Sequence, residues 1–168
     1  GSTETTPPLT MSHVLFRLFD CIRRFPNLDF LLLTKRVDNV IPSLIDAYRT
    51  SFSDKFGHTV AMLSDWKSGL RPPKNVWLGA SAENQATWDE RVTGPGGLTG
   101  IPAAVRWVSA EPLLGPIEPG SLAGIDWVVA GGESGPLNRA RPMHPYWPQQ
   151  LRNVCAAADV AFHFKQWG

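Results

Sequence analysis

The chain is poor in cysteine and has no long hydrophobic run. Its 168 residues include two cysteines, Cys21 and Cys155, which lie far apart and lack CxxC-type spacing. This pattern indicates neither a disulfide framework nor a structural zinc site, and we expect two buried thiols. No apolar run has the length of a membrane span, and no charged segment followed by an apolar stretch opens the chain. We therefore expect a cytoplasmic protein without a membrane partner.

The chain also lacks an excess of either charge. Sixteen lysines and arginines stand against 15 aspartates and glutamates, so the formal net charge is +1. A nucleic-acid partner is therefore not indicated. His13, His58 and His163 show no ligand spacing, and we expect no metal site in this chain. His144, which stands between Met143 and Pro145, is left open as a helix cap, a base or a ligand contact.

The first ten residues differ from the rest of the chain. Gly1 and Ser2 look like the scar of an expression tag, and residues 3–10 are polar and include two consecutive prolines. We expect a disordered lead-in over residues 1–10. The chain is 43% hydrophobic, which suits a globular protein with a core. We therefore expect residues 11–168 to form one domain.

Apolar residues at helical spacing alternate with short apolar runs. The spacing predicts helices over residues 11–25, 37–48, 83–92 and 147–158. Runs that are too short for a helix predict buried strands over residues 28–33, 76–80, 105–108, 126–130 and 161–165. Glycine and proline make us expect mostly irregular structure over residues 51–74, 112–124 and 134–145.

This order of elements predicts an α/β fold. Strands that alternate with helices pair in parallel through right-handed crossovers. Five strands are too few for a closed eight-stranded barrel. We therefore expect a partial, open β/α barrel of about five parallel strands, or else a three-layer open sheet.

A polar cluster follows each predicted strand. The clusters are residues 34–36, 81–84, 109–111, 131–134 and 165–167. In parallel α/β folds ligands bind outside the carboxyl ends of the strands, so the five clusters are expected to form one rim. We call these residues, together with Arg139 and Arg141, the carboxyl-end rim.

Three carboxylates of the rim, those of Glu83, Glu111 and Glu133, follow three different strands. Gathered in a cleft, they would do acid–base work or hold a cation or an amine. Alternatively, each forms a structural ion pair with a nearby cation. The candidate cations are Lys35, Arg36, Arg139, Arg141 and Lys165, which would equally suit a phosphate, sulfonate or carboxylate ligand. The sequence leaves both readings open.

Glycines dominate the cluster after the fourth strand, at residues 131–135. Without side chains, Gly131 and Gly132 would let backbone N–H groups approach an anion, and Glu133 would receive an amine or a hydroxyl. The alternative is a turn without a ligand. Of the tryptophans near strands, we expect three in the core and only Trp167 at a ligand. The core three are Trp77, Trp107 and Trp127.

Six ordered motifs resemble a family of proteins. They are residues 33–36, 75–79, 108–115, 131–135, 140–145 and 164–168. Together they resemble a phage-associated protein family that is widespread in bacteria and has no settled activity, over roughly residue 28 to the end. The resemblance implies a distant relation to radical S-adenosylmethionine enzymes, whose iron–sulfur cluster needs an amino-terminal cysteine triplet.

The triplet is missing from this chain, so we expect no cofactor here. S-adenosylmethionine and an iron–sulfur cluster would enter only with a missing amino-terminal part. The chain is then either the carboxyl-terminal portion of a longer enzyme or a shortened relative that lost the redox chemistry.

We therefore expect a rim that binds a small polar or nucleotide-like ligand, without radical chemistry in this chain. The expected ligand-binding residues are Lys35, Glu83, Glu111, Gly132, Glu133, Ser134, Arg141 and Lys165. A rival hypothesis is an enzyme that uses the rim carboxylates and Lys35 without a redox cofactor. A third is a dimeric assembly protein, because an open barrel leaves sheet edges that must be covered or paired.

Overall fold

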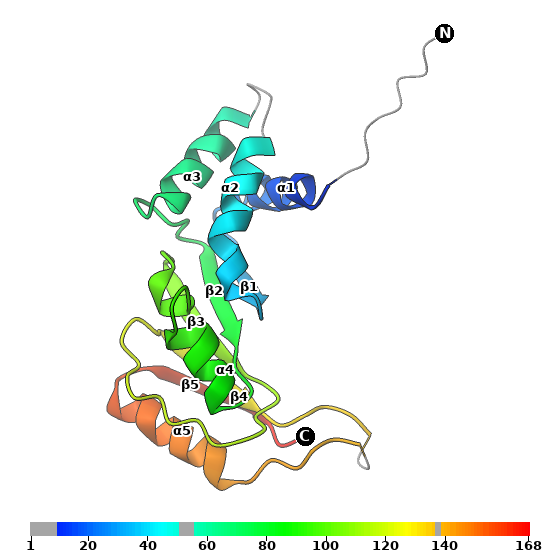
Figure 1. Cartoon of the computed structure of the whole chain (residues 1–168), viewed down its shortest axis with the longest axis vertical. Helices are drawn as coiled ribbons and strands as arrows, with labels where there is room; N and C mark the ends of the chain where they lie inside the picture. Colours follow the sequence, from blue (N-terminus) through cyan, green and yellow to red (C-terminus); the bar gives the residue numbers. More distant parts are fainter. Residues whose placement is uncertain (1–9, 51–55, 137–138) are drawn as a thin grey trace.

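A computed structural model of the chain describes residues 10–50, 56–136 and 139–168 (Figure 1). The expected disordered lead-in falls almost wholly on residues 1–9, which lie outside the described part. Thr10 is described and caps the first helix, α1 (Met11–Arg24). Its hydroxyl accepts the His13 amide, and the His13 ring accepts the Thr10 amide in return. This capping box begins the helix at the predicted residue.

Five parallel strands form one open sheet. The strands are β1 (Phe30–Thr34), β2 (Val76–Ser81), β3 (Val105–Ala110), β4 (Trp127–Gly131) and β5 (Ala161–Gln166). Their order in the sheet is β1-β2-β3-β4-β5, the same as in the chain. Each neighbouring pair is parallel. The predicted α/β fold with a five-stranded, open parallel sheet is confirmed, and β1 and β5 are its two edges.

The helices pack in two groups along the sheet (Figure 1). Near β1, α1 packs on α2 (Val40–Thr50) and α3 (Gly57–Lys67). Near the other edge, α5 (Tyr146–Ala157) packs on β5 and β4. Between them lie the single turn α4 (Gln85–Trp88), the π-helical turn η3 (Asp89–Thr93) and the 3-10 turn η4 (Leu98–Gly100). Another 3-10 turn, η1 (Val37–Asn39), leads into α2.

Two of the predicted elements need correction. Residues 51–74 are not mostly irregular, because α3 occupies 57–67 and buries Thr59, Leu63 and Trp66 on one face. The glycines that argued against a helix lie at its ends: Gly57 begins it, and Gly69 follows it with a positive φ of 78°. The predicted helix over residues 83–92 is shorter and changes its winding, since Asn84 caps α4 and η3 follows directly.

Alternate strand residues build the main core on the helix side of the sheet. Leu78, Ala80, Val108 and Ala110 belong to one buried cluster with Trp88. Phe162 and Phe164 of β5 pack at its margin. These residues occupy alternate positions along their strands, so the residues between them point to the opposite face.

Three tryptophans gather on that opposite face. Trp107 is buried and stacks on Trp127 with ring centroids 5.4 Å apart, while Trp77 meets Trp127 edge to face at 6.1 Å. The Trp107 indole lies over Gly79, where an added Cβ would come within 2.4 Å of the ring. Trp107 is 8% exposed, whereas Trp77 and Trp127 are only half-buried, on the face away from the helices. This corrects the prediction that all three lie in the core.

Only one of the two cysteines is buried. Cys155 lies within the core under α5, as predicted. Cys21 is exposed, which corrects the prediction, because it lies two positions after the buried Phe19 and therefore on nearly the opposite side of α1. Within the described ranges, no helix is both long and apolar enough to cross a membrane.

Candidate functional site

The carboxyl ends of the five strands lie along one edge of the sheet because all strands run in the same direction. The predicted site residues follow those ends, but the structure divides them into three separate ion-paired groups. The groups are Lys35 with Glu83, Glu111 with Lys165, and Glu133 with Arg141. Each of the three carboxylates thus has a cationic partner.

The first group is a three-residue cluster, the Glu83 cluster, formed by Lys35, Glu83 and Arg91. Lys35 follows β1 and Glu83 follows the neighbouring β2, so Lys35 Nζ reaches Glu83 Oε1 at 2.6 Å. Arg91 comes from η3, and its Nη1 lies 3.1 Å from Glu83 Oε2. The same Nη1 donates to the Ser81 carbonyl at 3.1 Å. The cluster therefore ties β1, β2 and η3 together.

Glu83 is the most enclosed group of this cluster. Its side chain is 11% exposed and that of Arg91 20%, whereas the Lys35 side chain is 62% exposed. Burial raises the pKa of Glu83, but the hydrogen bond from Lys35, its own backbone amide and the charges of Lys35 and Arg91 outweigh burial and hold the pKa below its usual value. Glu83 is therefore a carboxylate at neutral pH, with an oxygen bound to each cation.

A hollow of about 460 Å³ adjoins the Glu83 cluster. Its lining residues are Lys35, Arg36, Val37, Asp38, Glu90, Arg91, Pro95 and Gly96. The two acidic side chains are well exposed, Asp38 at 64% and Glu90 at 74%, and each lies near an arginine. Asp38 Oδ1 is 3.4 Å from Arg36 Nε, and Glu90 Oε2 is 3.9 Å from Arg91 Nε. Solvent screens these exposed pairs, so the enclosed charge of the hollow is that of Arg91.

The second group bridges two strands that are not neighbours. Lys165 of β5 lies 3.2 Å from Glu111, which follows β3, so the pair passes over the intervening β4. Ser109 Oγ donates to Glu111 Oε2 at 3.2 Å. Gly131 of β4 leaves the space for this bridge, because a Cβ there would lie 2.8 Å from Glu111 Oε1 and 3.5 Å from Lys165 Cβ.

The third group fastens the loop after β4. Arg141 donates to Glu133 from Nη2 at 2.5 Å, from Nε at 2.8 Å and from its backbone amide at 2.8 Å. These bonds, side chain first and backbone second, lower the pKa of Glu133 to about 2, and the same contact raises the pKa of Arg141. Ser134 Oγ accepts a hydrogen bond from Gln166 Nε2. The predicted site residues Glu133 and Ser134 are thus bound by other segments of the same chain.

Gly132 lies against the carboxyl-terminal residues of the chain. Its amide donates to the Gln166 carbonyl at 2.9 Å, and a Cβ at this position would fall 1.7 Å from the Trp167 carbonyl oxygen. The amide that was expected to meet an anion is therefore used by the chain itself. Trp167 remains 53% exposed and packs on Phe164 with centroids 4.7 Å apart.

The sequence reasoning missed Arg91. It lies in the predicted helix over residues 83–92, eight residues after Glu83, but its role depends on the switch from α4 to η3 that turns its side chain back to the end of β2. The expected cations Arg36 and Arg139 do not join a rim carboxylate among the described residues, and the ion-pair partner of Arg36 is Asp38. Of the two readings of the carboxylates, ion pairing is the one that the structure shows.

The two thiols do not fit an iron–sulfur cluster. Cys21 lies on the exposed side of α1, whereas Cys155 is buried in α5, where burial raises the pKa of its thiol to about 11 and disfavours the thiolate that a cluster requires. Among the residues that the structure describes, no group of three histidine, cysteine or acidic side chains lies close enough to hold a metal ion.

The chain belongs to the DUF5131 family, whose members are described as proteins of unknown function. The family model matches residues 9–168, so it includes α1 as well as the motifs that begin near β1. No curated protein and no solved structure matches the chain. The phage association and the distant likeness to radical S-adenosylmethionine enzymes stay predictions from the six motifs.

Proposed function

We propose that the hollow beside the Glu83 cluster binds a small polar ligand with an anionic group, such as the phosphate of a nucleotide. The observation that carries this proposal is the enclosed Arg91, which shares one carboxylate with Lys35 at the border of a 460 Å³ hollow. The hollow lies at the carboxyl ends of β1 and β2, where parallel α/β folds bind their ligands.

The charges of the cluster favour an anion. Lys35 and Arg91 carry two positive charges, and Glu83 supplies one negative charge between them. Arg91 uses Nη1 for both Ser81 and Glu83, and its Nη2 has no hydrogen-bond partner among the described residues. A guanidinium edge and an ammonium group on a common border are suited to the oxygens of a phosphate or a carboxylate.

Glu83 supports binding more than acid–base chemistry. Its two oxygens are occupied by Lys35 and Arg91, and its pKa lies below the usual value. A general base works best with a pKa near the working pH. We therefore assign Glu83 to positioning: it holds the two cations at the hollow.

The test is isothermal titration calorimetry with inorganic phosphate, adenosine monophosphate and uncharged adenosine. We expect the two anions to bind and adenosine to bind more weakly, with affinity that falls as salt rises because the contacts are partly exposed. Arg91→Gln removes the enclosed cation and should weaken anion binding about tenfold or more, since a charge-assisted hydrogen bond contributes about 1.5–3 kcal/mol.

Lys74→Gln is the matched control. Lys74 is exposed and precedes β2, so it lies at the amino end of the sheet, about 20 Å from the hollow at the usual rise per strand residue. This variant loses the same unit of charge and should bind the anions as the parent does. Arg91→Lys keeps the positive charge at this position. It therefore separates loss of the charge from a folding defect caused by replacing Arg91. Absence of anion binding, or equal weakening in Lys74→Gln and Arg91→Gln, would contradict the proposal.

A further inference from the structure

Most of the exposed large hydrophobic residues lie in α1, in β1 and in the segment between them. Nine large hydrophobic residues are exposed in the described part of the chain, and six of them fall within residues 11–33. The six are Met11, Val14, Phe25, Leu28, Leu31 and Leu33. β1 itself contains neither a charged residue nor a proline, the features by which proteins prevent an edge strand from pairing. Such an edge is prepared to accept another strand.

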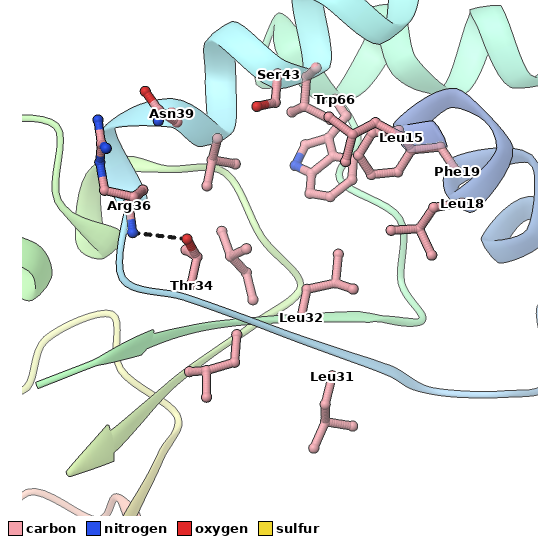
Figure 2. A pocket seen from close by; sticks show the side chains of 14 residues that line it. Leu15, Leu18, Phe19, Leu31, Leu32, Thr34, Arg36, Asn39, Ser43 and Trp66 are labelled. Carbon is pink, nitrogen blue, oxygen red and sulfur yellow. Dashed lines mark hydrogen bonds between the residues drawn. The ribbon is translucent and has the colours of Figure 1, made fainter. Parts of the chain in front are cut away.

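A groove of about 350 Å³ runs between this edge and α1. Leu15, Leu18 and Phe19 of α1 line it together with residues 31–33 of β1 (Figure 2). Within β1, Leu32 points toward the helices and Leu31 toward the other face (Figure 2). α1 packs mainly on α2 and α3, and β1 is the edge strand of the sheet. On its outer side the groove is therefore bordered by no strand of the described residues.

The opposite edge of the sheet, at β5, has apolar side chains that are only partly covered. Phe162 and Phe164 of β5 point to the helix side, where α5 packs on β5 and β4, yet both stay only half-buried. A second groove, of about 210 Å³, lies here and is lined by Phe162, Phe164, Trp167, Pro148, Gln149 and Arg152.

We propose that the β1 edge of one copy pairs in parallel with the β5 edge of a second copy. In this arrangement α1 covers Phe162 and Phe164 of the second copy, and the β5 strand of that copy fills the groove beneath Leu15 and Leu18. A two-fold axis along the strands repeats the contact at the other pair of edges, so two copies close on each other and no edge stays open.

A symmetric β1–β1 pairing satisfies less of the structure. Both copies would then bring a groove and its α1 to the same contact, and neither would supply a β5 strand to fill it. Phe162 and Phe164 would stay half-bare at both outer edges. The groove beside α1 at one edge and the half-buried phenylalanines of β5 at the other favour the β1–β5 contact.

The parent protein is tested by sedimentation velocity and light scattering over a range of concentrations. We expect a reversible dimer with twice the mass of the chain. The double variant Leu31→Glu/Leu33→Glu places negative charges on the β1 side of the seam, which is the β1–β5 contact between the two copies. The double variant Ala161→Lys/His163→Lys places positive charges on the β5 side. These four positions are exposed and lie on the face away from the helices. Each double variant should raise the dimer dissociation constant at least about 100-fold.

A mixture of the two double variants separates this arrangement from other ones. A mixed dimer has one unaltered seam and one seam in which glutamates face lysines, so mixing should restore the dimer. Leu70→Glu is the matched control, since Leu70 is 74% exposed and lies outside both edges, and it should leave the dimer intact. Circular dichroism verifies that every variant is folded.

Three outcomes would overturn the proposal. The first is a parent protein that stays monomeric at every concentration. The second is a dimer that the β5 variant leaves unchanged, which would indicate pairing through β1 alone. The third is a mixture of the two variants that does not associate although each variant is folded.

Discussion

Substituting Gly79 by alanine would place a methyl group inside the Trp107 indole. The added Cβ would lie 2.4 Å, 2.6 Å and 2.8 Å from three ring atoms, against the 3.4 Å at which ordinary contact begins. Trp107 must therefore move by about 1 Å, and it is held on two sides. Its Nε1 donates to the Trp77 carbonyl at 3.2 Å, and its ring stacks on Trp127 at 5.4 Å.

The expected cost follows from those contacts. Overpacking a close-packed site costs about 1–3 kcal/mol. Loss of the hydrogen bond adds about 0.5–1.5 kcal/mol, and disturbing the aromatic stack adds a similar amount. We expect Gly79→Ala to lower the free energy of unfolding by about 2–6 kcal/mol in urea titrations followed by circular dichroism and tryptophan fluorescence.

Gly120→Ala provides the control for this measurement. Gly120 has no heavy atom within 4 Å of a built Cβ and no positive φ, so its substitution should change the free energy of unfolding by less than about 0.5 kcal/mol. Trp107→Phe, combined with Gly79→Ala, should recover part of the loss through a favourable coupling between the two positions. A Gly79→Ala protein as stable as the parent would refute the reasoning that the tryptophans form a packed layer on this face.

Further predictions concern titration and thiol reactivity. Glu83 has a pKa below its ordinary 4.5 in the folded chain, so its contribution to stability is present above that value and is lost as pH falls through the lower, folded value. Glu83→Gln should therefore destabilise the protein at about pH 7, and the deficit should shrink as the pH of the urea titrations falls below 4.5. A deficit that stays the same across this range would contradict the assigned ion pairs. Cys21 should react with a thiol reagent at pH 8, whereas Cys155, buried and with its pKa raised to about 11, should react only after unfolding; two fast thiols in the folded protein would contradict this.

The three ion-paired groups explain how an open sheet holds its rim in place. The Glu83 cluster joins β1 to β2 and η3, and Glu111 with Lys165 joins β3 to β5. Glu133 and Arg141 fasten the loop that follows β4. The Glu83 cluster borders a hollow of about 460 Å³, and the proposed ligand site therefore lies at the β1–β2 part of the rim.

Local sequence patterns predicted the elements well where the signal lies within one element. The apolar stripe of α1 and the short apolar run before Lys35 each depend on neighbouring residues only, and the structure contains both elements. The pattern failed for α3, because glycine at a helix end and glycine inside a helix look alike in sequence. It failed for Cys21 as well, whose side of α1 is decided by what packs against the helix.

Strand length, helix spacing and their alternation are local properties, so the amino-acid order predicts an open sheet of parallel strands with charged residues at their carboxyl ends. Which of these charges meet depends on the three-dimensional arrangement. Lys165 reaches Glu111 because β5 lies next to β4 and Gly131 leaves the space between them, and Arg91 reaches Glu83 because η3 turns back toward β2. Those contacts depend on strand order and on a few ångströms of free space, which no spacing along the chain encodes.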